Sequence, residues 1–504
     1  MYANLYTLFA SRFPTDMSKI AIETGDGRRY TYGELDQYSA RFAGHFRRLG
    51  LMPGERVAVS VENSPQALFA YLGCLRAGLI YLPLNTAYQR SELTYFIKDA
   101  EPRAIVCRPE AAAIAREIAP AALVETLDAR GEGSLVEASR GLPADFSPVG
   151  RGPDDSTAIL YTSGTTGKPK GVMLSTRNLA VNAMALTDAW GTNGDDVLLH
   201  MLPLFHAHGL FVAAHCALLS ASKMWLTARF EVGVALKLLP CSTVFMGVPT
   251  HYGRLLADTG LNRELCRNMR LFTCGSAPLS VETFHRFEQR TGHFILERYG
   301  MTETLITTSN PLNGPRIAGS VGPALPGVSV RVVDEHGRPA LTGTNGQVQV
   351  KGDNVFRGYW KQPNKIARDF TGDGFFNTGD IGRLEHSGYL FLVGRAKDLI
   401  ISGGYNVYPK ELELVIDRIE GVAESAVFGV PHPDFGEAVV AAVVRSGRAE
   451  CPAAPEIIER LKGEVANYKV PKRVVFIDAL PRNAMGKVQK GLLSRDYDAL
   501  FGGT

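Results

Sequence analysis

Residues 161–171 form a polar loop between two predicted strands, and this arrangement constrains the fold more than any other feature of the chain. The apolar run at 157–160 predicts a buried strand before the loop, and the run at 171–175 predicts a second strand after it. The glycines of the loop let backbone N–H groups turn toward an anion, while its hydroxyls and lysines add donors and positive charge. The residues expected to hold a phosphate are Thr162, Ser163, Gly164, Thr165, Thr166, Gly167, Lys168 and Lys170.

This loop differs from the P-loop of kinases and related NTPases. The order Gly-x-x-x-x-Gly-Lys-Ser/Thr is absent from it, and a strand rather than a helix follows it. A strand-loop-strand site has no helix N-terminus to attract phosphates, so it depends on the loop itself and on residues from elsewhere in the chain. The segment therefore predicts a phosphate site outside the P-loop class.

Composition excludes several classes of protein. The 504 residues exceed one ordinary domain, and 45% hydrophobic with 21% charged residues is typical of a globular protein. A net charge of +3 indicates neither a nucleic-acid-binding surface nor a membrane surface. No apolar run approaches the roughly 20 residues of a membrane-spanning helix. Residues 1–13 lack the apolar core and cleavage site of a signal peptide, so we expect them to begin the fold, with a short transit sequence as the alternative.

The seven cysteines point to a reducing compartment, because they are odd in number, scattered, and without a Cys-x-x-Cys pair. We therefore expect a cytoplasmic protein with no nucleic-acid partner and no membrane insertion.

Predicted strands and helices alternate over most of the chain. Residues 56–61 alternate as a strand does, and Ser64 with Pro65 then provides an N-cap and a first-turn proline for a helix to about Ala77. Further short strands are predicted at 104–107 and 271–274. Such alternation predicts an α/β fold with parallel, doubly wound sheets.

The pattern changes twice toward the C-terminus. Short alternating strands at 328–333 and 347–351, separated by glycine and proline turns, predict a small antiparallel barrel or sheet. A boundary near 394–398 precedes a compact α+β unit. The expected organisation is a large N-terminal domain, residues 1–395, that combines doubly wound sheets with a β-barrel-like part, followed by a small α+β domain, residues 396–504.

Two further polar segments follow predicted strands, where open α/β sheets bind their ligands. Residues 275–279 follow the strand at 271–274, and residues 297–304 follow a strand at 293–296. Together with the loop at 161–171, these segments resemble the ATP signature of the acyl-adenylate-forming ligases. That family includes acyl-CoA synthetases, peptide-synthetase adenylation domains and luciferases.

The resemblance implies an ATP site with assigned roles. Thr302 contacts the α-phosphate and Glu303 holds Mg²⁺, which suits a hard cation that prefers carboxylates and clamps the departing phosphates. The residues that the resemblance places around the nucleotide are Ser276, Ala277, Pro278, Glu297, Tyr299, Gly300 and Met301.

Matches continue to the C-terminal end of the chain, in the family's order. Asp380 corresponds to the residue that accepts hydrogen bonds from the ribose hydroxyls, and Arg395 to a second ribose contact. Lys487 corresponds to the adenylation catalyst, whose positive charge faces the negative charge that develops during the reaction. The resemblance also implies that the small domain rotates about Lys397 between two half-reactions. Gly403, Gly404 and Tyr405 then contact the pantetheine arm of coenzyme A.

Within the family, the segments at 81–88, 202–210, 247–254 and 308–311 are most similar to malonyl-CoA synthetases. Malonate keeps a second carboxylate, and a buried carboxylate needs a cation, best an arginine fork. The resemblance assigns that role to Arg254, early in a helix from Pro249, and places His206 and Ser276 beside the acyl group. The malonate enzymes usually have Asn where Thr307 stands, so we expect Thr307 to loosen the pocket toward methylmalonate.

The sequence thus predicts an ATP-, Mg²⁺- and CoA-dependent acid–thiol ligase that forms malonyl-CoA, with Lys487, Thr302 and Glu303 as catalytic residues. The alternatives are a ligase for another small acid, an enzyme that loads a carrier protein, and a silent nucleotide-binding protein. A metal site at His200, His206, His208 and His215 is disfavoured, because no carboxylate or cysteine ligand accompanies them. Acylation of Lys487 would remove its charge, so we expect this position to serve as an off switch.

Overall fold

The computed structural model describes residues 4–162, 169–403, 405–447, 449–483 and 486–501, and within these ranges it contains four β-sheets. The first has the strand order β17-β8-β7-β4-β3-β5-β6. Its strands from β7 to β6 are parallel, and β8 and β17 extend it antiparallel. The strands are β3 (Arg56–Ser60), β4 (Ile80–Pro83), β5 (Ala104–Cys107), β6 (Leu123–Thr126), β7 (Ser156–Thr162), β8 (Lys170–Ser175) and β17 (Gly358–Tyr359).

The pairing of β7 with β8 confirms the strand-loop-strand prediction. The two strands are antiparallel, and Thr162 at the end of β7 lies opposite Lys170 at the start of β8. Residues 163–168, which carry most of the predicted phosphate donors, lie outside the described residues.

The second sheet has the order β14-β13-β12-β11-β9-β10-β1-β2. It is parallel from β13 to β1, with antiparallel strands at both edges. The strands are β1 (Ile20–Thr24), β2 (Arg29–Thr31), β9 (Val197–His200), β10 (Lys223–Leu226), β11 (Val244–Gly247), β12 (Leu271–Cys274), β13 (Ile295–Met301) and β14 (Leu305–Ser309). The two large sheets are the doubly wound part that the alternation predicts.

The predicted antiparallel part is a four-stranded sheet with the open order β15-β16-β18-β19. Its strands are β15 (Val328–Val333), β16 (Gly346–Gly352), β18 (Phe376–Leu384) and β19 (Leu390–Arg395). Of the two forms expected, sheet or barrel, the chain therefore adopts the sheet.

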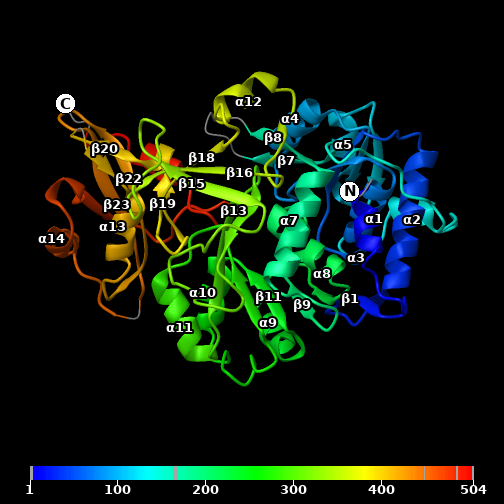
Figure 1. Ribbon diagram of the computed structural model, residues 1–504, viewed down its shortest axis with the longest axis horizontal. Helices are drawn as coiled ribbons and strands as arrows, with labels where there is room; N and C mark the ends of the chain where they lie inside the picture. The colour runs from blue at the N-terminus through cyan, green and yellow to red at the C-terminus, as the bar shows by residue number, and fades with distance from the viewer. Residues whose placement is uncertain (1–3, 163–168, 404, 448, 484–485, 502–504) are drawn as a thin grey trace.

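The C-terminal unit follows as a separate sheet with its own apolar cluster of buried residues. Its strands are β20 (Ile400–Ser402), β21 (Tyr405–Val407), β22 (Val422–His432), β23 (Gly436–Arg445) and β24 (Arg473–Phe476). In Figure 1 this unit, orange to red, occupies one end of the molecule beside β18 and β19, while the N-terminus lies toward the other end.

Helices cover the sheets, and local sequence explains where several of them begin. Ser64 caps α3 by accepting the N–H of Ala67, and Pro65 occupies the first turn, as the sequence predicts. Thr31 and Glu34 form a capping box at α2. The α-helices are α1 (Leu5–Ala10), α2 (Tyr32–Arg48), α3 (Pro65–Arg76), α4 (Arg90–Ala100), α5 (Ala112–Ile118), α6 (Ser134–Ser139), α7 (Thr176–Ala189), α8 (His215–Leu219), α9 (Val232–Leu238), α10 (Pro249–Ala257), α11 (Val281–Thr291), α12 (Pro363–Asp369), α13 (Pro409–Ile416), α14 (Ala454–Glu464) and α15 (Lys490–Asp496). Of the helices in the described ranges, none has the length and apolar character needed to cross a bilayer.

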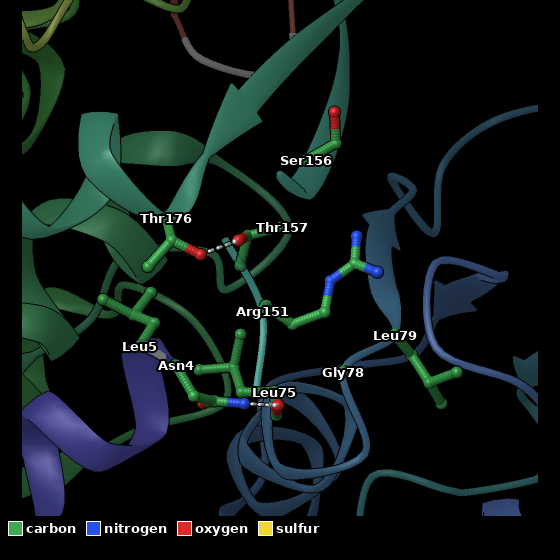
Figure 2. A pocket seen from close by; sticks show the side chains of 9 residues that line it. All are labelled: Asn4, Leu5, Leu75, Gly78, Leu79, Arg151, Ser156, Thr157 and Thr176. Atoms are coloured by element: carbon green, nitrogen blue, oxygen red, sulfur yellow. Dashed lines mark hydrogen bonds between the residues drawn. The ribbon is translucent and has the colours of Figure 1, made fainter. Parts of the chain in front are cut away.

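A small hollow lies where α1, α3 and the first residues of β7 meet (Figure 2). Asn4 closes it by donating from Nδ2 to the carbonyl oxygens of Leu75 at 2.7 Å and Val149 at 2.8 Å. The hydroxyls of Thr157 and Thr176 bond at 2.8 Å on its other side. Its volume of about 10 Å³ suits at most one water molecule. We regard it as a packing feature at the opposite end of β7 from the phosphate loop.

Candidate active site

One cavity of about 400 Å³ gathers residues from Thr162 to Lys487. Its lining has two parts. The Glu303 wall consists of Thr162, Lys170, Thr302, Glu303 and Tyr359, and the Arg298 wall consists of His206, His208, Ser276, Arg298 and Ile306. The predicted site residues that the structure brings together here are Thr162, Lys170, His206, Ser276, Gly300, Met301, Thr302, Glu303, Arg395, Lys397 and Lys487.

The Glu303 wall combines a buried carboxyl with a lysine from the phosphate hairpin. The Tyr359 hydroxyl donates to Glu303 Oε1 at 3.3 Å, and the Lys170 ammonium lies 4.9 Å from the centre of the Tyr359 ring. Burial raises the pKa of Glu303, and within the described residues no salt bridge to it forms. A buried carboxyl that faces a cavity without a paired cation fits the oxygen-ligand chemistry of Mg²⁺.

The segment that carries Glu303 differs from the sequence prediction in one respect. Residues 297–304 were expected to follow a strand, but β13 extends to Met301, so that only Thr302 to Thr304 form the turn into β14. Antiparallel pairing with β14 lengthens β13, with Tyr299 opposite Thr308. Gly300 is required at the bulge in this pairing, because a Cβ there would lie 1.8 Å from the Leu305 carbonyl oxygen.

Asp380, Arg395 and Tyr299 form a network beside the cavity. Arg395 Nε lies 2.7 Å from Asp380 Oδ1, and the Tyr299 hydroxyl donates to Asp380 Oδ2. Burial raises the pKa of Asp380, against the opposing effect of the Arg395 guanidinium. The pairing of β18 with β19 sets Asp380 opposite Arg395, so the sheet fixes the two residues that the resemblance assigns to the ribose.

Lys487 enters this cavity from the C-terminal unit. Desolvation and then the positive charge of Arg395 lower the pKa of Lys487. The Lys487 backbone N–H donates to Asn483 Oδ1 at 3.0 Å. A Cβ on Gly486 would lie 3.2 Å from Thr250, so Gly486 packs against the start of α10.

Other predicted residues lie elsewhere. Ala277, Pro278 and Glu297 are not among the described residues that line the cavity. Glu297 is buried, accepts the Gly319 N–H at 3.3 Å, and burial raises its pKa to about 8. Tyr405 is 59% exposed and Gly403 is exposed as well, whereas Gly404 lies outside the described residues.

The Arg298 wall holds a cation that the sequence prediction missed. Arg298 is 5% exposed, and its Nε and Nη2 have no hydrogen-bond partner within the described part of the chain. Burial lowers its pKa to about 10, which still leaves the guanidinium charged near neutral pH. A buried, charged and unpartnered arginine on a cavity wall is suited to an anionic ligand.

Two neutral histidines flank this arginine. Burial and then the charge of Arg298 lower the pKa of His206 to about 4, and burial places the pKa of His208 well below its usual range. His208 Nδ1 and Ser276 Oγ are 3.3 Å apart, and the backbone N–H of His208 donates to His206 Nδ1 at 3.2 Å. The wall therefore offers one positive charge surrounded by neutral hydrogen-bonding groups. Within the described residues no group of three or more His, Cys, Asp or Glu side chains is arranged to hold a metal ion.

The structure does not bring Arg254 to this wall, contrary to the sequence prediction. Arg254 lies on α10, as expected, but its side chain is exposed and is not among the described cavity-lining residues. The buried residues of α10 are Tyr252, Leu255 and Leu256, whose spacing turns Arg254 toward solvent.

Thr307 also lies away from the cavity lining. It is fully buried on β14, and its hydroxyl is 3.3 Å from that of Thr304. Its neighbour Ile306 lines the cavity instead. Leu305 on the same strand lines the cavity as well, so these two side chains, rather than Thr307, bound the pocket.

Comparison with known proteins identifies the family. The model of the AMP-binding enzyme matches residues 9–360, and the model of the AMP-binding enzyme C-terminal domain matches residues 411–487. The chain belongs to the AMP-binding enzyme family. Both matches agree with the fold described above, a large N-terminal part followed by a small C-terminal domain.

Three members of the family show how specific the match is. A malonate–CoA ligase of Arabidopsis thaliana is 32% identical over 95% of this chain and 86% of its own length. A feruloyl-CoA synthase of a Streptomyces species is 34% identical over 94% of both chains. The crystal structure of ATP-bound MatB from Rhodopseudomonas palustris has a TM-score of 0.97 at 49% identity, covering 99% of this chain and 100% of that one. The apo structure of MatB has a lower TM-score of 0.85 at the same identity.

These matches confirm the predicted class, an AMP-forming acid–thiol ligase that uses ATP, Mg²⁺ and CoA. The difference between the two TM-scores means that this chain has an arrangement closer to ATP-bound MatB than to apo MatB. The identities to the malonate–CoA ligase and to the feruloyl-CoA synthase are nearly equal. The acid that the enzyme activates therefore has to be argued from the Arg298 wall.

Proposed function

We propose that the enzyme forms malonyl-CoA from malonate, ATP and CoA, with release of AMP and pyrophosphate. The observation that carries this proposal is Arg298, a buried cation without an ion-pair partner within the described residues. Malonate reacts through one carboxylate and keeps the other, which Arg298 neutralises in the cavity. His206 and Ser276 provide neutral hydrogen-bonding groups on the same wall. The similarity to malonate–CoA ligases and to MatB supports this choice.

The residues of the cavity divide the first half-reaction among them. One malonate oxygen attacks the α-phosphorus of ATP, the bond to pyrophosphate breaks, and malonyl-AMP forms. Lys170 and Thr162 hold the phosphates, Thr302 contacts the α-phosphate, and Lys487 neutralises the charge that develops there. Glu303 would hold Mg²⁺, which when bound neutralises phosphate charge.

The second half-reaction needs a different arrangement of the chain. The CoA thiol attacks the carbonyl carbon of malonyl-AMP, AMP leaves, and the thioester forms. We divide the chain for this purpose into residues 1–395 and 396–504, with Lys397 as the hinge. In the arrangement of the structure, Lys487 lines the cavity, whereas Gly403 and Tyr405 are exposed to solvent. Rotation of the small domain moves Lys487 out of the cavity and brings Gly403 and Tyr405 to its entrance, where they face the CoA thiol.

The proposal is tested by supplying purified enzyme with MgATP, CoA and one acid at a time. Malonate, methylmalonate, succinate, acetate and ferulate are compared, with AMP and acyl-CoA measured by chromatography. Malonyl-CoA is expected as the dominant product, with methylmalonyl-CoA second. Preference for a monocarboxylate would refute the role of Arg298. Release of AMP without a CoA thioester would indicate that a carrier protein, rather than CoA, accepts the acyl group.

Gly275 supplies a second test of the Arg298 wall. A Cβ at Gly275 would lie 2.5 Å from Cζ of Arg298, so the arginine occupies the space that only glycine leaves. Gly275→Ala is expected to displace Arg298 and to raise KM for malonate about tenfold, because a misplaced guanidinium loses about 1.5 kcal/mol of hydrogen bonding to the carboxylate. Gly253→Ala on α10 is the matched control, because a Cβ there meets nothing within 4 Å. Equal KM values in the two variants would contradict this placement of Arg298.

Acylation of Lys487 is proposed as an off switch, since it removes the charge that faces the developing phosphoryl charge. We expect enzyme with acylated Lys487 to lose adenylation and to recover it on enzymatic deacylation. Mass spectrometry of the native protein under several growth conditions checks whether the modification occurs. Full adenylation by acylated enzyme would contradict the proposal.

A further inference from the structure

Tyr359 contacts both charged groups of the Glu303 wall. Its side chain is 4% exposed, its hydroxyl donates to Glu303 Oε1 at 3.3 Å, and the Lys170 ammonium lies 4.9 Å from its ring centre. Glu303 and Lys170 are carried by different sheets, on the turn after β13 and at the start of β8. Tyr359 therefore joins the carboxyl assigned to the metal with the lysine assigned to the phosphates.

The backbone around Tyr359 is tied to the same two elements. The Phe356 N–H donates to the Glu303 carbonyl oxygen at 2.8 Å, and Asn354 Nδ2 donates to that of Thr304 at 2.7 Å. On the other side, the Trp360 N–H donates to the Gly171 carbonyl oxygen at 2.7 Å. Residues 354–360 thus connect the Glu303 turn to the hairpin of the phosphate loop.

Helix α7 also holds residues 354–360 in place. Asn178, on α7, donates from Nδ2 to the carbonyl oxygens of Asp353 and Val355, each at 2.8 Å. Tyr359 itself pairs with Val172 in the short strand β17. Residues 353–360 are therefore held by β8 through Tyr359 and Trp360 and by α7 through Asp353 and Val355, which fixes the position of this segment.

The hydroxyl of Tyr359 acts as a donor at neutral pH. A tyrosine hydroxyl is protonated at neutral pH, and here it donates to Glu303 Oε1. A donor fixed beside a carboxylate orients it and leaves its remaining lone pairs for a cation.

We propose that Tyr359 is a positioning residue, which holds Glu303 oriented toward Mg²⁺ and Lys170 toward the phosphates of the same nucleotide. The inference rests on the proposed role of Glu303 as the metal-binding carboxylate. It predicts that the hydroxyl and the ring of Tyr359 have separable effects, one on the metal and one on the phosphates.

The test measures ATP binding by calorimetry without acid substrate, once in EDTA and once at saturating Mg²⁺. Tyr359→Phe keeps the ring and removes the hydroxyl, so we expect the EDTA dissociation constant to stay at the wild-type value. With Mg²⁺ we expect about tenfold weaker binding than wild type, the effect of losing one hydrogen bond to a charged group. Tyr359→Leu also removes the ring beside Lys170, so we expect weaker binding than wild type in both conditions.

Two controls separate this inference from the assumption on which it rests. Tyr389→Phe removes a tyrosine hydroxyl that bonds to the Pro315 carbonyl oxygen at 2.8 Å, outside the cavity, and we expect wild-type binding. Glu303→Gln should lose the gain in affinity that Mg²⁺ provides. If Glu303→Gln loses this gain and Tyr359→Phe retains it, the positioning role is overturned while Glu303 keeps its own. If Glu303→Gln also retains the gain, the metal assignment fails and the inference fails with it.

Discussion

Replacing Arg298 by methionine is expected to lower kcat/KM for malonate by about two to three and a half orders of magnitude. Leaving a carboxylate buried without its cation costs about 3–5 kcal/mol, and each 1.4 kcal/mol is about tenfold. Methionine is long and apolar, so it fills most of the same space on the wall and adds no buried charge that would destabilise the fold. Because the ATP site is formed by other residues, we expect ATP binding to remain at the wild-type level and propionate to become a better substrate than malonate.

The matched control for this variant is Arg254→Met. Both arginines match the chemical argument from sequence, but only Arg298 is buried on the cavity wall, whereas Arg254 is exposed on α10. Steady-state kinetics with malonate and with propionate, and calorimetric binding of ATP, give the comparison. Loss of malonate turnover in Arg254→Met, with Arg298→Met unaffected, would show that Arg254 on α10, and not Arg298, binds the second carboxylate of malonate.

The difference between these two arginines shows how far sequence reasoning reaches. The need for an arginine follows from the charge of malonate, and the helix from Pro249 was predicted correctly. The face that Arg254 presents depends on which residues of α10 pack against the sheet, and that is a tertiary fact. Arg298 was overlooked because residues 297–304 were expected to lie beyond a strand. Only the antiparallel pairing of β13 with β14 shows that Arg298 belongs to a strand with one side on the cavity.

Local signals were more dependable where they concerned a single element. The capping of α3 by Ser64 and the hairpin of β7 and β8 follow from a few adjacent residues, and the structure confirms both. Tyr359 could not be found in this way, because its contacts with Glu303 and Lys170 join residues far apart in the sequence. The sequence therefore predicts local motifs, whereas contacts between residues far apart in the sequence require the three-dimensional structure.

Replacing Lys487 by alanine is expected to slow adenylation by about two to three orders of magnitude and to spare thioester formation. The Lys487 side chain lines the cavity near Arg395, and the adjacent Gly486 packs on α10 at Thr250. Removing a charged group directed at developing negative charge costs about two to three orders of magnitude in kcat. In the proposed second half-reaction the small domain is rotated and Lys487 has left the cavity, so we expect its loss to have little effect on that step.

The two half-reactions are measured separately on the same preparation. Adenylation is followed as pyrophosphate release from malonate and MgATP, and thioester formation is followed from supplied malonyl-AMP and CoA. Lys462→Ala, which removes an exposed lysine paired with Glu459 on the same domain, should match wild type in both. An equal loss in both half-reactions of Lys487→Ala would mean that the lysine acts on CoA or on folding of the domain. A loss confined to adenylation would support the proposal that Lys487 serves the first step from a domain that rotates before the second.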